Sequence, residues 1–239
     1  MQLGVDEAGK GPVLGSMFAA CVRVPADAIP DDVADSKQLS ADKRESLAAT
    51  IRERADAVGV AEIPVARIDD PETDMNELTV DAHVQALSQV ARDDLPAYLD
   101  AGDTNAVRFE RRVADRVAAD IELRAEHGAD EEYPIVSAAS IVAKVSRDAH
   151  VADLAAEYDG QGYGDIGSGY PGDSTTREFL KTYVEAEGEL PACARRSWQT
   201  SQDALAGLDQ SSLTAFEEGN RSSAPEFEDP EDQSSLTDF

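Results

Sequence analysis

An almost unbroken apolar segment near the N-terminus is the feature that most limits how this chain can fold. It reads Val13-Leu14-Gly15-Ser16-Met17-Phe18-Ala19-Ala20-Cys21-Val22. A strand with one face in water alternates apolar and polar residues, whereas a strand covered on both faces is apolar throughout. We therefore predict that residues 13–24 form a strand covered on both faces, joined by a glycine-rich turn to a first strand at residues 2–6.

Helix-like and strand-like segments alternate over the next 160 residues or so. Ser40 and Pro134 are typical helix-start residues. We expect helices at about 40–55, 76–92, 105–118, 134–158 and 175–187, and strands at about 58–63, 97–100 and 121–125. In the long helix, we expect Val142, Val145 and Ala149 to be buried, with Ser137, Ser140 and Lys144 on another stripe. Such alternation is typical of an α/β domain.

The composition changes after Ala206, where Ser, Asp, Glu and Gly replace most apolar residues. We therefore divide the chain into a folded domain, residues 1–206, and an acidic tail, residues 207–239, which we expect to be disordered when free. The tail contains the segment Asp-Gln-Ser-Ser-Leu-Thr-x-Phe twice, at 209–216 and 232–239, with seven of eight positions identical. This repeat indicates a short recognition motif, although a degenerate acidic repeat is the alternative.

The chain is strongly acidic, with 49 Asp and Glu residues against 21 Lys and Arg residues and a formal net charge of −28. In dilute buffer such a surface repels a polyanion, but in molar salt the Debye length falls to about 3 Å and the repulsion is largely screened. We therefore hypothesise a halophilic source with a salt-filled cytoplasm. The sequence has neither a secretory leader nor a membrane-spanning segment, so we expect the protein to be cytoplasmic. Cys21 and Cys193 are interpreted as core thiols.

Acidic residues lie at the ends of two predicted strands. Asp6 and Glu7 follow the first strand and precede a glycine-rich loop with Lys10, and Asp100 closes the strand at 97–100. Because ligands of α/β sheets gather at the carboxyl ends of strands, these acids are candidates for one site. The alternatives are a surface turn for Asp6 and Glu7, and a helix cap or turn for Asp100.

Two further acids have weaker local signals. Asp130 lies just before the long helix, where acids are common as caps. Asp103, three residues after Asp100, is interpreted as a cap for the helix that follows. Two histidines, His83 and His150, lie in predicted helices without a ligand partner at i+4, and are interpreted as structural or exposed.

The motifs in combination resemble a known family. Val5-Asp6-Glu7-Ala8-Gly9-Lys10-Gly11-Pro12 is similar to the ribonuclease HII signature, in which two acids precede a Gly-Arg/Lys-Gly loop. Further matching segments follow in the family's order: Asp35-Ser36-Lys37-Gln38-Leu39, Leu99-Asp100-Ala101, Ala129-Asp130, the segment 137–145 and Gly167-Ser168-Gly169-Tyr170-Pro171. The resemblance covers roughly residues 2–200 and is of the archaeal type.

The resemblance implies an RNase H-like fold, with a mixed central sheet flanked by helices and a helical C-terminal lobe. It implies an endonuclease that cleaves the RNA strand of RNA–DNA hybrids and incises 5′ of single ribonucleotides in duplex DNA, leaving a 3′-hydroxyl and a 5′-phosphate. Asp6, Glu7, Asp100 and Asp130 would be the catalytic acids and the ligands of two Mn²⁺ or Mg²⁺ ions, for which carboxylate oxygens are suitable ligands.

The resemblance also implies residues that bind the substrate. Gly9, Lys10 and Gly11 would contact the 2′-hydroxyl and neighbouring phosphates, and Tyr170 would stack near the RNA–DNA junction, unless it is an ordinary loop aromatic. Lys37 and Lys144 would flank the site. Many members carry arginine where this chain has Lys10, and lysine lacks the planar fork of arginine. A general hybrid nuclease without junction preference is therefore one alternative function. A scaffold that binds hybrids without cutting them is another, although the presence of all four acids argues against it.

The repeated tail segment resembles a sliding-clamp-binding box, Gln-x-x-Leu-x-x-Phe. The resemblance implies that a sliding clamp is a partner and that a flexible peptide folds on binding. Each copy has one aromatic residue where two are usual, and two copies on one tail would compensate through effective concentration. The clamp-binding residues would be Gln210, Leu213 and Phe216 in the first box and Gln233, Leu236 and Phe239 in the second. We expect the chain itself to be a monomer.

Overall fold

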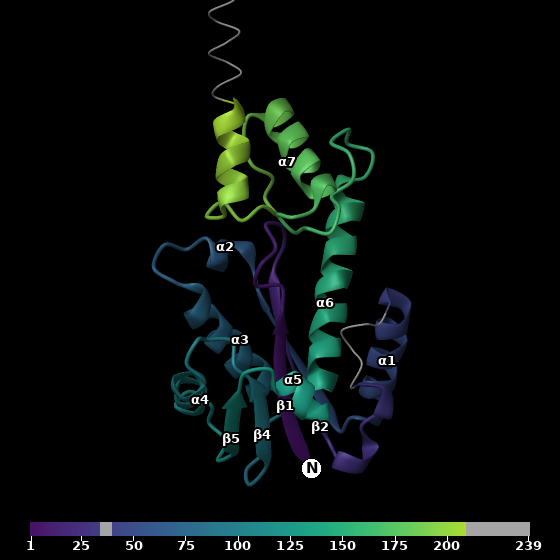
Figure 1. Cartoon of the computed structure of the whole chain (residues 1–239), viewed down its shortest axis with the longest axis vertical. Coiled ribbons are helices and arrows are strands. Elements are labelled where there is room, and N and C mark those ends of the chain that lie inside the picture. The colour runs from purple at the N-terminus through teal and green to yellow at the C-terminus, as the bar shows by residue number, and fades with distance from the viewer. Residues whose placement is uncertain (34–39, 209–239) are drawn as a thin grey trace, which may run out of the picture.

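The computed structural model describes residues 1–33 and 40–208, and its centre is a five-stranded mixed sheet (Figure 1). The strands are β1 (Gln2–Ala8), β2 (Met17–Val24), β3 (Ala57–Ile63), β4 (Pro96–Asp100) and β5 (Glu122–Glu126). Their order across the sheet is β3-β2-β1-β4-β5. Strands β1, β2 and β3 pair antiparallel, whereas β1, β4 and β5 pair parallel. The predicted α/β class with a mixed sheet is therefore confirmed.

Helices cover both faces of this sheet. They are α1 (Ala41–Arg54), α2 (Val65–Ile68), α3 (Met75–Ser88), α4 (Ala106–Ala114), α5 (Ala129–Glu132), α6 (Pro134–Tyr158) and α7 (Ser174–Glu187). A last helical segment spans residues 199–208. Helices α6 and α1 lie on one face of the sheet and α3 and α4 on the other (Figure 1). No helix of the described segments is long and apolar enough to cross a membrane.

Strand β2 is buried at all eight positions, as its apolar sequence predicts. It begins at Met17 rather than at Val13, so the predicted strand was too long at its start. Val13 and Leu14 instead pack into the core of the C-terminal lobe, and Leu14 forms a β-bridge with Ala194. The apolar run therefore contributes to three cores: one on each face of the sheet, through alternate residues of β2, and one in the lobe, through Val13 and Leu14.

Helix α6 links the sheet to the lobe. It begins at Pro134 and ends at Tyr158, as the sequence predicts. Its N-terminal end lies close against β1, because a β-carbon added to Gly4 would stand 2.3 Å from the Ile135 carbonyl oxygen. The prediction of its buried face was wrong at Ala149, which is exposed. Residues 135–143 of α6 are buried all round the helix, so no single stripe marks its core side.

The C-terminal lobe packs α7, the segment 199–208 and the end of α6 around a separate apolar core (Figure 1). Phe179 and Leu180 of α7 are almost fully buried in it, and the ring of Tyr158 meets Phe179 edge-on. Cys193 belongs to this core, whereas Cys21 belongs to the core between the sheet and helices α3 and α4. Both cysteines are buried free thiols, which confirms their interpretation.

Candidate functional site

Asp6 and Glu7 lie at the carboxyl end of β1 and point to opposite faces of the sheet, as the alternation of a strand requires. Asp6 faces α6, where Ser140 lies beside it. Glu7 faces α3, where its Oε2 lies 2.7 Å from His83 Nε2. The two adjacent acids therefore reach toward the helical layers on either side of β1.

The parallel register of β1 and β4 brings Asp100 next to this pair. Val5 of β1 pairs with Leu99 of β4. The next residue in each strand is an acid, Asp6 in β1 and Asp100 in β4, so the two acids lie at the same edge of the sheet. Burial raises the pKa of Asp6 well above its usual value, and the charges of Glu7 and Asp100 raise it further. Asp6 is only 6% exposed, and its ionised form is costly unless a cation is close.

Asp100 connects this pair of acids to Asp130. Burial raises the pKa of Asp100, and the charges of Glu7 and Asp130 add to that increase. The backbone N–H of Ala129 donates to Asp100 Oδ1 at 2.9 Å, and this hydrogen bond lowers the pKa of Asp100. The four predicted acids therefore interact electrostatically, and the structure brings them together at one end of β1 and β4.

Asp130 lies in the short helix α5 rather than in a loop. Gly128 precedes this helix with a φ of +69°, a left-handed conformation that glycine adopts without strain. The hydroxyl of Ser137 in α6 donates to the Asp130 carbonyl oxygen, and this hydrogen bond joins α5 to α6. The backbone between β5 and α6 is therefore fixed where Asp130 approaches Asp100.

His83 has the structural position that was one of the two interpretations of its sequence, and it lies next to the acids. It is fully buried, contacts Glu7 and meets the ring of Phe109 edge-on with centroids 5.0 Å apart. Burial by itself would raise the pKa of Glu7, but the hydrogen bond with His83 and the charges of His83 and Lys10 lower it overall. Glu7 is therefore the readily ionised member of the pair with Asp6.

Asp103, which was interpreted as a helix cap, has a structural role. Asn105, not Asp103, caps α4 through its side chain, so the predicted cap was placed two residues too early. The Asp103 side chain is buried and accepts from Arg108 Nη2 at 2.7 Å. This hydrogen bond with Arg108 is the main reason that the pKa of Asp103 is lowered.

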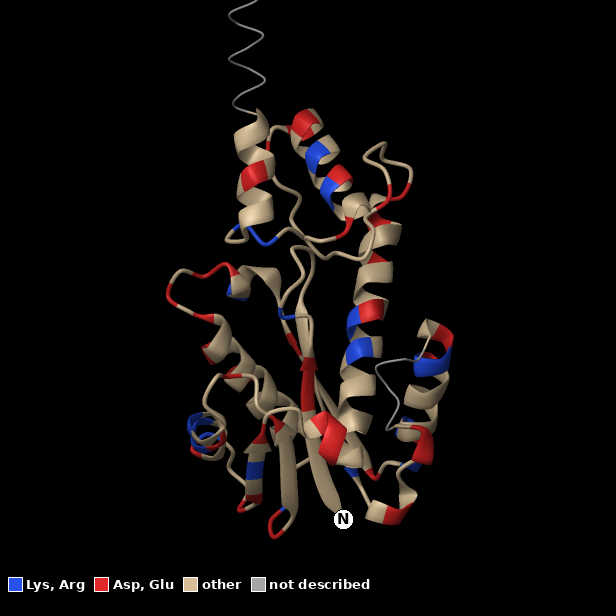
Figure 2. Cartoon of the chain, in the orientation of Figure 1, with Lys and Arg blue, Asp and Glu red and all other residues tan. Residues whose placement is uncertain are grey.

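A cleft of about 430 Å³ lies beside Glu7 at the end of β1. Its wall consists of Glu7, Ala8, Gly9, Lys10, Gly11, Arg44, Lys144, Arg147, Asp148 and Tyr170. Four of these residues are basic and two are acidic, whereas acidic residues outnumber basic ones by more than two to one in the whole chain. Figure 2 shows basic residues on α6, on α1 and on the loop after β1, the elements that contribute the basic side chains of the cleft. The cleft is thus a local exception to the acidic surface.

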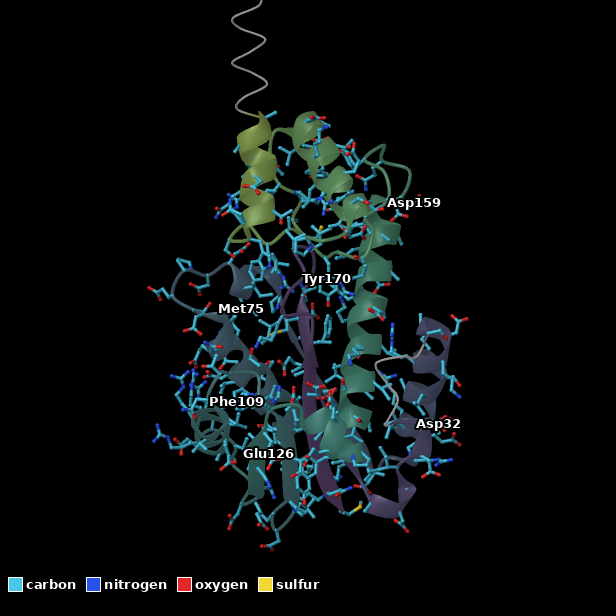
Figure 3. All side chains as sticks on the ribbon, viewed as in Figure 1. Asp32, Met75, Phe109, Glu126, Asp159 and Tyr170 are labelled. Atoms are coloured by element: carbon cyan, nitrogen blue, oxygen red, sulfur yellow. The ribbon has the colours of Figure 1, made fainter. Side chains whose placement is uncertain are left out.

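Predicted substrate residues Gly9, Lys10, Gly11, Lys144 and Tyr170 all line this cleft. Figure 3 shows Tyr170 where the C-terminal lobe meets α6 and the top of β1.

Arg147 and Arg44 also line the cleft, and neither was predicted from the sequence. The Arg147 guanidinium lies over the Tyr170 ring at 4.7 Å, and it donates to the Ser168 carbonyl oxygen. Arg147 continues the stripe of Ser137, Ser140 and Lys144 by three more residues, which is a signal that could have found it.

Several predicted residues lie outside the described residues. These are Asp35 and Lys37, and in the tail Gln210, Leu213, Phe216, Gln233, Leu236 and Phe239. The proposed boundary at residue 206 falls within the helical segment 199–208.

In residues 1–33 and 40–208, no three His, Cys, Asp or Glu side chains stand in an arrangement that could hold a metal ion. The donor chemistry of the acid cluster nevertheless fits divalent cations, because it offers only hard carboxylate oxygens beside one hydroxyl. That hydroxyl, Ser140 Oγ, is buried next to Asp6 and has no hydrogen-bond partner of normal geometry among the described residues.

The chain is similar to known proteins in both sequence and structure. The family model "Ribonuclease HII" matches residues 3–201. Ribonuclease HII of Halobacterium salinarum is 64% identical over 215 residues, which cover 90% of this chain and 99% of that protein. The crystal structure of ribonuclease H2 from Pyrococcus horikoshii superimposes with a TM-score of 0.79 at 35% identity, over 87% of this chain and 98% of that one.

A PCNA:RNase HII complex from Archaeoglobus fulgidus contains a second similar structure. It has a TM-score of 0.75 at 34% identity, over 85% of this chain and 96% of that one. These likenesses confirm the RNase H-like fold. The chain therefore belongs to the ribonuclease HII family, and it is a hydrolytic nuclease that cuts the RNA strand of RNA–DNA hybrids.

Proposed function

We propose that this nuclease incises duplex DNA on the 5′ side of a single embedded ribonucleotide and leaves a 3′-hydroxyl and a 5′-phosphate. The observation that carries this proposal is the position of four interacting acids next to a basic cleft that contains the Gly9-Lys10-Gly11 loop. Acids alone would repel a phosphodiester, and a basic cleft alone would only bind it. Together they provide for both binding and cleavage at one edge of the sheet.

Asp6, Glu7, Asp100 and Asp130 are the residues that we propose to hold two Mn²⁺ or Mg²⁺ ions. Bound ions of this kind supply an activated water for attack on the phosphate and charge stabilisation of the leaving 3′ oxygen. The raised pKa of Asp6 fits this role, since a nearby cation would offset the repulsion from Glu7 and Asp100. His83 contacts Oε2 of Glu7, and the other carboxylate oxygen, Oε1, lies 3.8 Å from Lys10 Nζ.

The cleft residues would bind the substrate backbone. Lys10 and Lys144 would neutralise phosphates, and we propose the same role for Lys37, which lies outside the described residues. Tyr170 is 42% exposed, so its ring is available for stacking near the RNA–DNA junction, and Arg147 holds its other side. Because all these residues belong to one chain, we propose that the monomer is the active form.

Substrate preference tests this proposal directly. We expect kcat/KM for a duplex with one ribonucleotide to be at least as high as for a uniform RNA–DNA hybrid, and an all-DNA duplex not to be cut. The reason is that a site that contacts a substrate hydroxyl discriminates strongly against an analogue that lacks it. Each substrate would be labelled at the 5′ end of the cut strand and tested with Mn²⁺ and with Mg²⁺.

Mapping of the product ends completes this test. One product that ends in a 3′-hydroxyl immediately 5′ of the ribonucleotide supports the proposal. Cleavage of the uniform hybrid alone would instead identify a general hybrid nuclease without junction preference. Binding of either duplex without any cleavage, by protein shown to be folded, would favour a scaffold that does not cut.

We also propose that the tail binds a sliding clamp through its two repeated boxes. Two observations support this: the near-identical repeats at 209–216 and 232–239, and the Archaeoglobus fulgidus relative, which was solved as a PCNA:RNase HII complex. In each box, leucine and phenylalanine would enter an apolar pocket while glutamine bonds at its edge. Two boxes on one tail raise the effective concentration of the second when the first is bound.

Calorimetric titration of the full chain with the clamp measures this interaction. Each substitution Phe216→Ala and Phe239→Ala should weaken binding, and the double variant should weaken it at least about 30-fold, because buried aromatic anchors contribute about 2 kcal/mol or more each. Phe227→Ala is the matched control, since Phe227 lies in the same tail outside both boxes. Equal heats for the double variant and the unsubstituted chain would contradict the proposal.

A further inference from the structure

The loop after β1 is held from behind by one side chain of the C-terminal lobe. Arg195 donates to three backbone carbonyl oxygens: Nη2 to Gly9 at 2.6 Å, Nη1 to Lys10 at 2.9 Å and Nε to Gly15 at 2.9 Å. About 180 residues separate donor and acceptors along the chain. Arg195 therefore ties the lobe to both ends of the loop that lines the cleft.

Arg195 is buried in an unusual way for a charged residue. It is 0% exposed, and in the described part of the chain no carboxylate forms a salt bridge with it. Burial, together with the charge of Arg147, lowers its pKa to about 10, so Arg195 remains charged at neutral pH. A buried charge is costly unless it is well satisfied by hydrogen bonds. Here the backbone of the loop satisfies it.

Trp198 holds the next carbonyl of the same loop. Its indole Nε1 donates to the Gly11 carbonyl oxygen at 3.3 Å, and the Arg195 guanidinium lies over its ring at 4.9 Å. All three carbonyls of the Gly9-Lys10-Gly11 loop thus accept a hydrogen bond from two neighbouring side chains of the lobe.

This anchoring determines where the backbone N–H groups of the loop point. In a planar trans peptide, the carbonyl of one residue and the N–H of the next point in opposite directions. With the Gly9 and Lys10 carbonyls turned to Arg195, the N–H groups of Lys10 and Gly11 point away from it. Both residues line the cleft, and neither N–H donates to an acceptor in the described residues. Gly9 permits this conformation with a φ of +92°.

From this geometry we propose that Arg195 and Trp198 are positioning residues that hold two loop N–H groups ready for the phosphate and 2′-hydroxyl of a ribonucleotide. This inference rests on the proposed function, because it concerns the same cleft. The lobe thereby determines substrate affinity and sugar discrimination, whereas the four acids on the sheet determine the rate of the chemical step. A merely structural lobe would affect stability alone.

Two substitutions test the inference by steady-state kinetics on the single-ribonucleotide duplex in 3 M KCl. Arg195→Lys keeps the charge but loses the planar set of donors, and should raise KM about tenfold while kcat changes less than about twofold. Trp198→Phe removes only the indole donor and should raise KM about threefold. The matched control is Tyr163→Phe, which removes one hydrogen bond of the lobe, to Glu187 at 2.5 Å, far from the loop in sequence.

Binding without cleavage provides a second readout. In Ca²⁺, fluorescence anisotropy should show that both variants lose more affinity for the ribonucleotide duplex than for the all-DNA duplex, and that Tyr163→Phe changes neither. Thermal unfolding of each variant in the same buffer shows which are folded. If Arg195→Lys does not fold, Trp198→Phe carries the test.

The outcomes separate this inference from the proposed function. Wild-type protein that neither binds nor cuts the ribonucleotide duplex would overturn both. Wild-type cleavage together with folded variants of unchanged KM and unchanged sugar discrimination would overturn only the positioning role. A fall in kcat of the size predicted for the rise in KM, with KM itself unchanged, would also overturn the positioning role, since the loop would then act on the chemical step.

Discussion

The substitution Asp6→Asn is expected to reduce cleavage at least about 1000-fold and, at the same time, to stabilise the folded protein. Activity falls because the amide cannot replace a carboxylate as a ligand of a hard cation. Stability rises because the buried Asp6 carboxylate is costly: burial and the charges of Glu7 and Asp100 raise its pKa in the folded state. The two effects have opposite signs, which a general disruption of the fold would not produce.

The pH dependence of this stability difference follows from the raised pKa. Between the usual pKa of an aspartate, about 4, and the higher value in the folded state, the folded protein holds more protons on Asp6 than the unfolded chain does. Wild-type stability therefore falls as pH rises through this range. The asparagine side chain of the variant does not titrate, so Asp6→Asn should gain stability at pH 7 and lose that advantage as pH approaches about 4.

Thermal unfolding with a chelator present measures this effect without interference from metal. Each unit of pKa shift corresponds to about 1.4 kcal/mol, so the variant should unfold several degrees higher at pH 7. Glu122→Gln is the control, since Glu122 is an exposed acid of β5 remote from the cluster, and it should alter neither property. A less stable Asp6→Asn variant, or one that keeps a tenth of the activity, would contradict this account.

The second large effect is expected from salt. With a formal net charge of −28, the folded chain repels itself, and this repulsion acts over a Debye length of about 10 Å at 0.1 M salt but about 3 Å at 1 M. Unfolding spreads the charges apart and relieves the repulsion. We therefore expect the midpoint of thermal unfolding to be about 10 °C or more higher in 3 M KCl than in 0.1 M KCl.

Substrate binding should respond to salt in an unusual direction. Protein–DNA affinity ordinarily falls steeply as salt rises, because bound cations are released from the phosphates. In this chain screening also removes repulsion by the net negative charge of the protein, so KM should fall or stay level between 0.1 and 1 M KCl. Sucrose at equal osmolality is the control, since it is excluded from protein surfaces but screens no charge. Greater stability at low salt would refute the halophilic interpretation.

Local sequence patterns predicted much of the fold because they depend on neighbouring residues. The bounds of α6 follow from Pro134 and the helical pattern, and the start of α1 follows from Ser40, whose hydroxyl accepts from the Lys43 N–H. Helix α3 ends four residues earlier than predicted. The Gln89 side chain there bonds the Gln85 and Val60 carbonyls and joins the helix end to β3, a tertiary contact that periodicity does not show.

The candidate site was predicted in part for the same reason. Acids at strand ends can be identified from sequence, and the sheet register then brings Asp6 and Asp100 together. The partners of these groups come from distant segments. His83 is 76 residues from Glu7, and Arg195 is 186 residues from Gly9. Nothing in the local sequence of either residue distinguishes it from an ordinary core histidine or surface arginine.

Asp130 is the acid with the weakest signal in its own sequence neighbourhood, and we propose that it acts with the acids of β1 and β4. The direct test is cleavage of a labelled duplex with one ribonucleotide by wild-type and Asp130→Asn protein, in 3 M KCl with Mn²⁺. We predict one cut, immediately 5′ of the ribonucleotide, by wild-type protein and a loss of at least about 100-fold in the variant. Cleavage by a folded Asp130→Asn variant at the wild-type rate would contradict the account.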